Sequence, residues 1–234
     1  MAIEWVFFDI GDVLFDEDVP HLYHFHLMVL AMRRHGVEVS WDDYRMQIRQ
    51  SVQTSPDSAI EAAARHFVPD DALWDQIRQE SQEEYKTARK PHPYGLLLDN
   101  ITAVVQDLRR DFRLGIIANQ HPPVLQALDT YGIGRHFDVK AINEVIGLSK
   151  PDPAMYRWAL EQAGCAPERA MMIGDRPDND IAPARALGMP TIRFQRGVLY
   201  VWYEPVQERE HADLIIRDTM DLPRAVRRLA LKQP

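Results

Sequence analysis

Two segments far apart in the sequence each place aspartates directly after a run of apolar residues. The run Trp5 to Phe8 leads to Asp9. The run Ala170 to Gly174 leads to Asp175, and Asp180 follows in the same acidic stretch. Such runs are typical of buried strands in a parallel sheet, and ligands bind at the carboxyl ends of these strands. Crowded carboxylates repel one another, so the pattern indicates a site for a hard cation such as Mg²⁺, which also binds phosphate oxygens.

Each aspartate also has an ordinary structural explanation. Aspartate is common in the turn after a strand, and Asp180 is placed to cap the N-terminus of a following helix. Capping explains Asp180 but leaves Asp175 without a role. The metal-site interpretation therefore stands beside the structural one.

A lysine precedes a proline-initiated helix between these two segments. Lys150, in the stretch Gly147 to Pro153, is one of five lysines in the chain. Lysines usually face solvent, but a helix that starts at the strand ends directs this ammonium toward the carboxylates and a bound phosphate.

Strand-like and helix-like segments alternate through the C-terminal part, which predicts an α/β fold with a Rossmann-like parallel sheet. We expect strands at 3–8, 114–118, 139–142, 171–173, 191–194 and 214–216. We expect helices at 98–110, 122–131, 153–163, 180–187 and 222–231.

The stretch 16–93 interrupts this alternation with four helix-like segments and no convincing strand. Ser40 reads as the N-cap of one of these helices. The prolines in Lys90 to Pro93 are typical of a hinge or linker. We predict a catalytic core from 1–15 and 94–234, and an inserted all-helical cap domain from 16–93.

Composition and charge narrow the function classes. The chain has 46% hydrophobic and 26% charged residues, as ordinary globular proteins do. Its net charge of −8 opposes binding to nucleic acid and to anionic membranes, and its arginine pairs fit solvated helix faces. Cys165 is the single cysteine, so no internal disulfide forms. Without a signal-peptide or membrane-spanning pattern, we expect a soluble cytoplasmic protein.

Four motifs in order resemble the haloacid dehalogenase (HAD) superfamily. They are Phe7-Phe8-Asp9, Ile116-Ile117-Ala118-Asn119, Ser149-Lys150-Pro151-Asp152-Pro153, and Ile173-Gly174-Asp175 followed by Asp180. The similarity extends from residue 3 to about residue 195. It implies a Rossmann-like core with a helical cap and, for a phosphatase-type member, Mg²⁺-dependent hydrolysis of a small phosphorylated metabolite through an aspartyl-phosphate.

The resemblance also assigns roles to residues. Asp9 is the expected nucleophile. The expected Mg²⁺ ligands are the Asp9 carboxylate, the Gly11 carbonyl and the Asp175 carboxylate. Asp180 lies behind them to orient water or Lys150. Lys150 neutralises Asp9 and the transferred phosphoryl group, and it also contacts the substrate.

Two positions depart from the phosphatase pattern. Gly11 stands where an aspartate usually acts as general acid and base, a contribution of about 10²–10⁴-fold. Asp12 is a weak replacement candidate, because adjacent residues of an extended segment point in opposite directions. Ala118 replaces the phosphate-binding serine or threonine, which removes one charge-assisted contact of about 1.5–3 kcal/mol. The backbone amides of Asn119 and Gln120 remain as candidate phosphate ligands.

The same residues bear on other functions within the family and outside it. The family's dehalogenases lack the metal-binding aspartate, so Asp175 argues against dehalogenation. Phosphonate-cleaving members use a cap lysine, yet no lysine precedes Lys86. A catalytically weak or inactive phosphometabolite- or partner-binding protein remains the alternative, supported by Gly11 and Ala118. The aromatic run 200–203 fits core packing or a protein contact better than substrate binding.

Overall fold

The computed structural model describes residues 2–89 and 95–231, which form two compact units. The core unit consists of Met1–Asp16, Leu96–Arg196 and Pro205–Pro234. The helical unit consists of Glu17–Gly95 and Gly197–Glu204. The expected hinge at Lys90 to Pro93 lies outside the described residues.

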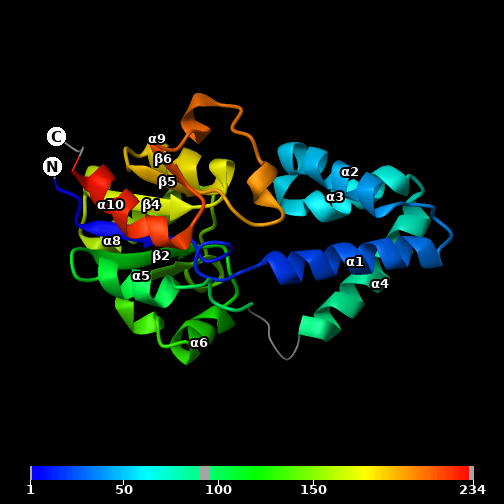
Figure 1. Ribbon diagram of the computed structural model, residues 1–234, viewed down its shortest axis with the longest axis horizontal. Coiled ribbons are helices and arrows are strands. Elements are labelled where there is room, and N and C mark those ends of the chain that lie inside the picture. The colour runs from blue at the N-terminus through cyan, green and yellow to red at the C-terminus, as the bar shows by residue number, and fades with distance from the viewer. Residues whose placement is uncertain (1, 90–94, 232–234) are drawn as a thin grey trace. The chain divides into compact units, whose positions relative to one another are not determined.

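The core unit is built on a six-stranded parallel sheet with strand order β3-β2-β1-β4-β5-β6 (Figure 1). The strands are β1 (Trp5–Phe8), β2 (Arg113–Ala118), β3 (Phe137–Ile142), β4 (Ala170–Gly174), β5 (Thr191–Phe194) and β6 (Leu214–Ile216). This confirms the predicted α/β class and all six expected strands. The boundaries differ from the predicted ones by at most two residues at either end.

The central strand β1 is buried on both faces, which explains its unbroken apolar sequence. Phe8 is paired in register with Ile116 of β2 and Ile173 of β4. Helices cover both faces of such a sheet. On one face, Met155 and Tyr156 pack in the same cluster as Trp5 and Phe7.

The five predicted helices of the core unit are present, one with a corrected start, and a short helix at Asn143–Ile146 was not predicted. The helices are α5 (Ile101–Leu108), α6 (Pro123–Thr130), α7 (Asn143–Ile146), α8 (Pro153–Ala163), α9 (Ala182–Ala186) and α10 (Leu222–Ala230). Single 3₁₀ turns lie at Gly134–His136, Pro167–Arg169, Glu208–Glu210 and Thr219–Asp221. The helix expected at 180–187 was wrong at its start, because Pro177–Ile181 forms a π-helical turn before α9. Asp180 is thus part of that turn and not the cap of a helix.

The helical unit contains the four expected helices around a hydrophobic core of its own. They are α1 (Asp18–Arg34), α2 (Trp41–Thr54), α3 (Ala59–Phe67) and α4 (Asp71–Arg89), with a 3₁₀ turn at Pro56–Ser58. Ser40 caps α2, since its hydroxyl accepts a hydrogen bond from the backbone of Asp43 at 3.1 Å. The Tyr44 hydroxyl donates to the Ile60 carbonyl at 2.9 Å and so ties α2 to α3.

The segment Gly197–Glu204 packs with the helical unit, whereas the sequence-based division placed it in the core. Leu199 and Tyr203 are buried in the helical unit's hydrophobic core. The side-chain amide of Gln53 donates to the Trp202 carbonyl at 2.6 Å, and the Arg49 guanidinium lies 3.5 Å from the Trp202 ring centroid. Tyr200–Trp202 is a 3₁₀ turn. Packing, one of the two roles expected for this aromatic run, is confirmed for Tyr203.

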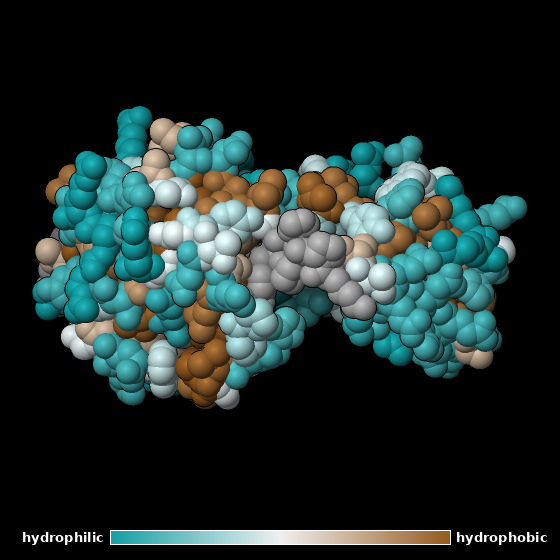
Figure 2. Space-filling model, turned by 90° about the horizontal axis from the view of Figure 1, so that it is seen from below, coloured by the Kyte–Doolittle hydropathy of each residue, from teal (hydrophilic) through white to brown (hydrophobic). Residues whose placement is uncertain are grey.

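The face drawn in Figure 2 is mostly hydrophilic, with apolar side chains in small groups. Among the helices of residues 2–89 and 95–231, none combines the length and the apolar character that crossing a membrane requires.

Gly115 of β2 leaves room for the Phe7 ring of the neighbouring strand β1. A Cβ at Gly115 would lie 2.4 Å from Cε1 of Phe7. We expect Gly115→Ala to lower the free energy of unfolding by about 1–3 kcal/mol, because the added methyl overpacks the core. Urea unfolding measures this. Combined with Phe7→Leu, which shortens the opposing side chain, the same substitution should cost clearly less; equal costs in both backgrounds contradict the explanation.

Candidate active site

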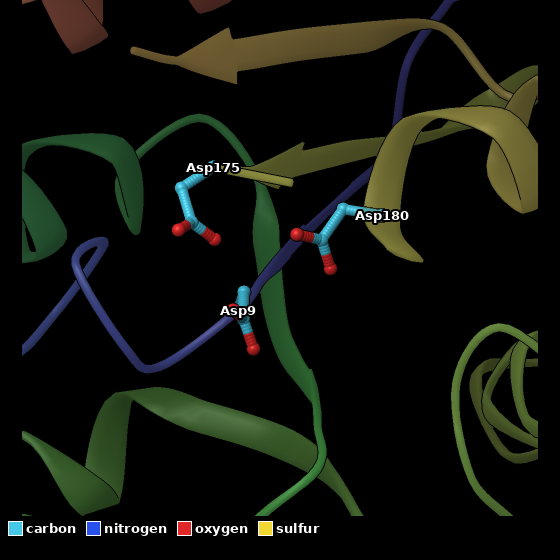
Figure 3. A group of neighbouring side chains, drawn as sticks. All are labelled: Asp9, Asp175 and Asp180. Carbon is cyan, nitrogen blue, oxygen red and sulfur yellow. The ribbon is translucent and has the colours of Figure 1, made fainter. Parts of the chain in front are cut away.

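Three carboxylates converge where β1 and β4 end (Figure 3). Asp9 follows β1, Asp175 follows β4, and Asp180 comes from the π-helical turn. One carboxylate oxygen from each of them lies within 4.8 Å of the other two. The cluster therefore joins residues from opposite ends of the chain at the carboxyl edge of the sheet.

Strand register places the first two of these aspartates side by side. The Asp9 amide donates to the Ile173 carbonyl at 2.9 Å, which continues the β1–β4 ladder beyond Phe8. Gly174 makes room for the third. A Cβ at Gly174 would lie 2.3 Å from both Cβ and Cγ of Asp180, so only glycine lets this side chain fold back over the strand.

Lys150 is held between two of the carboxylates. Its Nζ lies 2.7 Å from Oδ1 of Asp9 and 2.6 Å from Oδ1 of Asp180. The side chain is 2% exposed, so these contacts replace water as the ammonium's hydrogen-bond partners. Burial by itself lowers the pKa of Lys150, but Asp180 and Asp9 outweigh burial and hold this pKa above its usual range. Lys150 is therefore a permanent positive charge in the cluster.

The cluster retains an excess of negative charge. Burial, followed by the charges of Asp180 and Asp9, raises the pKa of Asp175 well above its usual range. Burial also raises the pKa of Asp180, although Lys150 opposes that effect. One ammonium does not balance three carboxylates, two of which are buried. The donor set thus fits a divalent cation with oxygen ligands, which would supply the missing positive charge.

Residues of the loop after β2, which were expected to bind phosphate, make hydrogen bonds within the protein. Ala118 is fully buried at the end of the strand. The Asn119 side-chain amide donates to the Lys150 carbonyl, and its oxygen accepts from the Lys150 amide, both at 2.9 Å. The Gln120 amide donates to Oδ1 of Asn143 at 2.6 Å. The Asn119 side chain therefore fixes the Lys150 backbone, and the Gln120 amide already has a partner within the protein.

Asp12 and Gly11 lie in the turn after Asp9. Asp12 adopts a left-handed backbone conformation with φ 51° and is 1% exposed. One of its oxygens accepts from the Arg196 guanidinium at 3.1 Å, and the same guanidinium contacts Asp16 at 3.3 Å. Gly11 forms an isolated backbone bridge with Phe15. Asp12 is thus engaged by Arg196, and it is not one of the three clustered carboxylates.

Several supporting residues were not anticipated from the sequence. The Tyr156 hydroxyl donates to the Asn179 carbonyl at 2.7 Å, and Arg176 pairs with Asp178 at 2.7 Å. Both contacts stabilise the turn that carries Asp180. Nε of buried Arg193 donates to the Asp175 carbonyl at 3.3 Å. An arginine inside the apolar strand β5 was the one available signal, since buried charges are rare without a partner.

Comparison with known proteins supports the same family along most of the chain. Residues 3–188 match the haloacid dehalogenase-like hydrolase family. A phosphoserine phosphatase from Thermus thermophilus is 32% identical over 111 residues, which cover 47% of this chain and 45% of that protein. A glyceraldehyde 3-phosphate phosphatase from Methanopyrus kandleri is 34% identical over 142 residues, 60% of this chain and 58% of that protein. The chain therefore spans about half the length of these curated relatives.

Solved structures show the same fold at low sequence identity. The HAD-hydrolase YfnB from Bacillus subtilis superposes with a TM-score of 0.65 and 17% identity, over 97% of this chain and 99% of that chain. A haloacid dehalogenase-like family hydrolase from Xanthomonas campestris superposes with a TM-score of 0.67 and 18% identity, over 99% and 98%. On the match to residues 3–188 and on this fold, the chain belongs to the haloacid dehalogenase-like hydrolase family.

Proposed function

We propose that this protein is a Mg²⁺-dependent phosphatase that hydrolyses a small phosphorylated metabolite through an aspartyl-phosphate at Asp9. The observation that carries the proposal is the convergence of Asp9, Asp175 and Asp180, with Lys150 bonded to two of them. The names of the relatives support it, because phosphoserine and glyceraldehyde 3-phosphate are small phosphorylated metabolites.

Exposure distinguishes the nucleophile from the other two carboxylates. The Asp9 side chain is 13% exposed, whereas Asp175 and the Asp180 side chain are 3% and 0% exposed. A substrate reaches the cluster through Asp9. A carboxylate oxygen of Asp9 attacks phosphorus, and the resulting aspartyl-phosphate is then hydrolysed by water, so one difficult displacement becomes two easier ones.

The other residues of the cluster bind charge. In this proposal Asp9, the Gly11 carbonyl and Asp175 hold Mg²⁺, which shields the phosphate oxygens from the carboxylates when bound. Lys150 neutralises the nucleophile and the transferred phosphoryl group, since phosphoryl transfer depends mainly on positioning and charge stabilisation. Asp180 orients Lys150 through the 2.6 Å contact and is itself held by the Arg176 amide at 3.0 Å.

The two units suggest a division of labour. The core unit supplies the carboxylates and Lys150, and we assign the helical unit the role of a substrate-selecting cap. The proposed cap includes Gly197–Glu204 as well as the inserted helices. We expect the protein to act in the cytoplasm on a diffusible metabolite, without a nucleic-acid or membrane partner.

A second candidate is a HAD-fold protein that binds a phosphometabolite or a partner with little or no turnover. The engaged Gln120 amide favours it, since one candidate phosphate ligand is already occupied next to Ala118. The two candidates differ in whether Asp9 is needed for phosphate release.

Replacing the nucleophile tests the proposed activity directly. We expect Asp9→Asn to lower Mg²⁺-dependent release of p-nitrophenol from p-nitrophenyl phosphate by at least about 10³-fold, because the amide cannot form the covalent intermediate. Removal of Mg²⁺ with EDTA should also abolish the activity of the natural protein. Progress curves of both proteins, purified in parallel, give the result. Superimposed curves refute the proposal and favour the binding protein.

The charge excess predicts that removal of the Asp175 charge stabilises the metal-free protein. Because the folded protein raises the Asp175 pKa, ionisation of this group costs stability as the pH rises above the unfolded carboxyl range. We expect Asp175→Asn to raise the free energy of unfolding in EDTA at pH 7 by about 0.5–2 kcal/mol. The gain should vanish below about pH 4, where the group is protonated in both states.

Urea unfolding with and without Mg²⁺ provides the measurement for Asp175→Asn. The natural protein should gain stability on Mg²⁺ addition, because an ion that binds only the folded state stabilises it by mass action. The variant should lose most of that gain. A variant that is less stable than the natural protein in EDTA contradicts the account of the charge excess.

Adding a hydroxyl at position 118 tests whether this position contacts the phosphate. We expect Ala118→Ser to raise kcat/KM for p-nitrophenyl phosphate about tenfold or more, because a hydrogen bond to a charged phosphate contributes about 1.5–3 kcal/mol. Ala118→Cys is the matched control, since its thiol has a similar size but donates weakly. Equal effects of serine and cysteine indicate that position 118 does not contact the phosphate.

A further inference from the structure

The leaving group at this site must depart either with a donated proton or as an anion. An alcohol that leaves phosphorus needs a proton, and a positioned acid contributes about 10²–10⁴-fold to that step. An acyl or aryl oxygen leaves as a stable anion and needs none. Which proton donors surround Asp9 therefore decides which phosphate compounds the protein can cleave.

The turn after Asp9 offers no such donor. Gly11 has no side chain, and Asp12 is 1% exposed with its carboxylate turned to the Arg196 guanidinium at 3.1 Å. The Asp12 oxygen bonded to Arg196 accepts that hydrogen bond and donates none. Arg196 also holds Asp16 at 3.3 Å, so both acids of this turn are ion-paired.

The other ionisable groups at this edge of the core unit have partners too. Lys150 bridges Asp9 and Asp180. His121, in the loop after β2, bonds Glu144 at 2.6 Å, and its side chain is 73% exposed. Asp175 and Asp180 are assigned to Mg²⁺ and to Lys150 in the proposed function, so His121 is the competitor that enters the experiment.

From these contacts, and resting on the proposed phosphatase function, we propose that the substrate is a phosphate compound whose leaving group departs as a stable anion. An acyl phosphate is the expected class, rather than an alkyl phosphomonoester. Arg196 is a positioning residue in this account, because it holds the Asp12 carboxylate in an ion pair.

The reaction balances without a protein acid. An Asp9 oxygen forms a bond to phosphorus while the bond from phosphorus to the acyl oxygen breaks, and the carboxylate leaves with the electron pair. Water then attacks phosphorus of the aspartyl-phosphate and the Asp9 carboxylate is regenerated. Both protons of that water remain on the inorganic phosphate.

The first test compares leaving groups on the natural protein with Mg²⁺. The substrates, in order of increasing leaving-group basicity, are acetyl phosphate, p-nitrophenyl phosphate, phenyl phosphate and ethyl phosphate. We expect kcat/KM to fall by at least about 10²-fold from p-nitrophenyl to ethyl phosphate, since no acid assists the alcohol. The quantity is kcat/KM because it reports the attack by Asp9, whereas kcat also contains the later hydrolysis step.

Equal kcat/KM values across the series overturn the inference and leave the phosphatase proposal intact, since they require a donor from either unit. No turnover of any substrate above the Asp9→Asn background overturns both. The two failures are therefore distinguishable.

Variants at Gly11 test independently whether a proton donor is missing. Gly11 is not among the described glycines with positive φ, so its backbone conformation is one that other residues also adopt. We expect Gly11→Asp to raise kcat/KM for ethyl phosphate at least about tenfold more than for acetyl phosphate, because it adds the missing acid. Gly11→Ala, which adds only a methyl group, should not. Equal gains on both substrates contradict the inference.

Two further variants, Asp12→Asn and His121→Asn, test these two residues as proton donors. Each should leave the ratio of the acetyl phosphate and ethyl phosphate kcat/KM values unchanged within about threefold, since neither residue is assigned a proton to donate. A selective loss on ethyl phosphate in either variant identifies that residue as the donor and overturns the inference.

Discussion

The buried ion pairs of Lys150 with Asp9 and Asp180 are the interaction on which the site depends. Charges removed from water are tolerated only when hydrogen bonds satisfy them, and removal of one partner leaves an uncompensated charge. The surrounding contacts meet that requirement. Asn119 holds the Lys150 backbone from β2, and the Arg176 amide holds Asp180. The charged cluster is therefore an assembly of several strand ends, with geometry fixed by the sheet.

Two glycines make room for neighbouring side chains, one within the sheet and one at the site. Gly115 allows the Phe7 ring to pack against β2, and Gly174 allows Asp180 to turn back over β4. Both are positions where even one methyl group collides with a neighbour. Gly115 thus permits aromatic packing near the centre of the sheet, and Gly174 permits carboxylate packing at its edge.

The loop after β2 and the turn after β1 together give this site its particular character. In both places the expected catalytic group is replaced, and neighbouring polar groups have partners within the protein. The Gln120 amide is bonded to Asn143, and Asp12 is bonded to Arg196. In the proposed function, groups for metal binding and for nucleophilic attack are present, while assistance to the leaving group is reduced. This combination favours substrates that need little help at the departing oxygen.

The sequence by itself determined the parallel α/β core, its six strands and the helical insertion, because each depends on local periodicity of apolar residues. It also indicated the acids and the lysine, since these follow strands whose carboxyl ends must share an edge. Only the tertiary structure placed Gly197–Glu204 with the helical unit, paired Arg196 with Asp12 and put Arg193 beneath Asp175. These contacts join residues distant in sequence, and no local pattern encodes which distant partner a side chain meets.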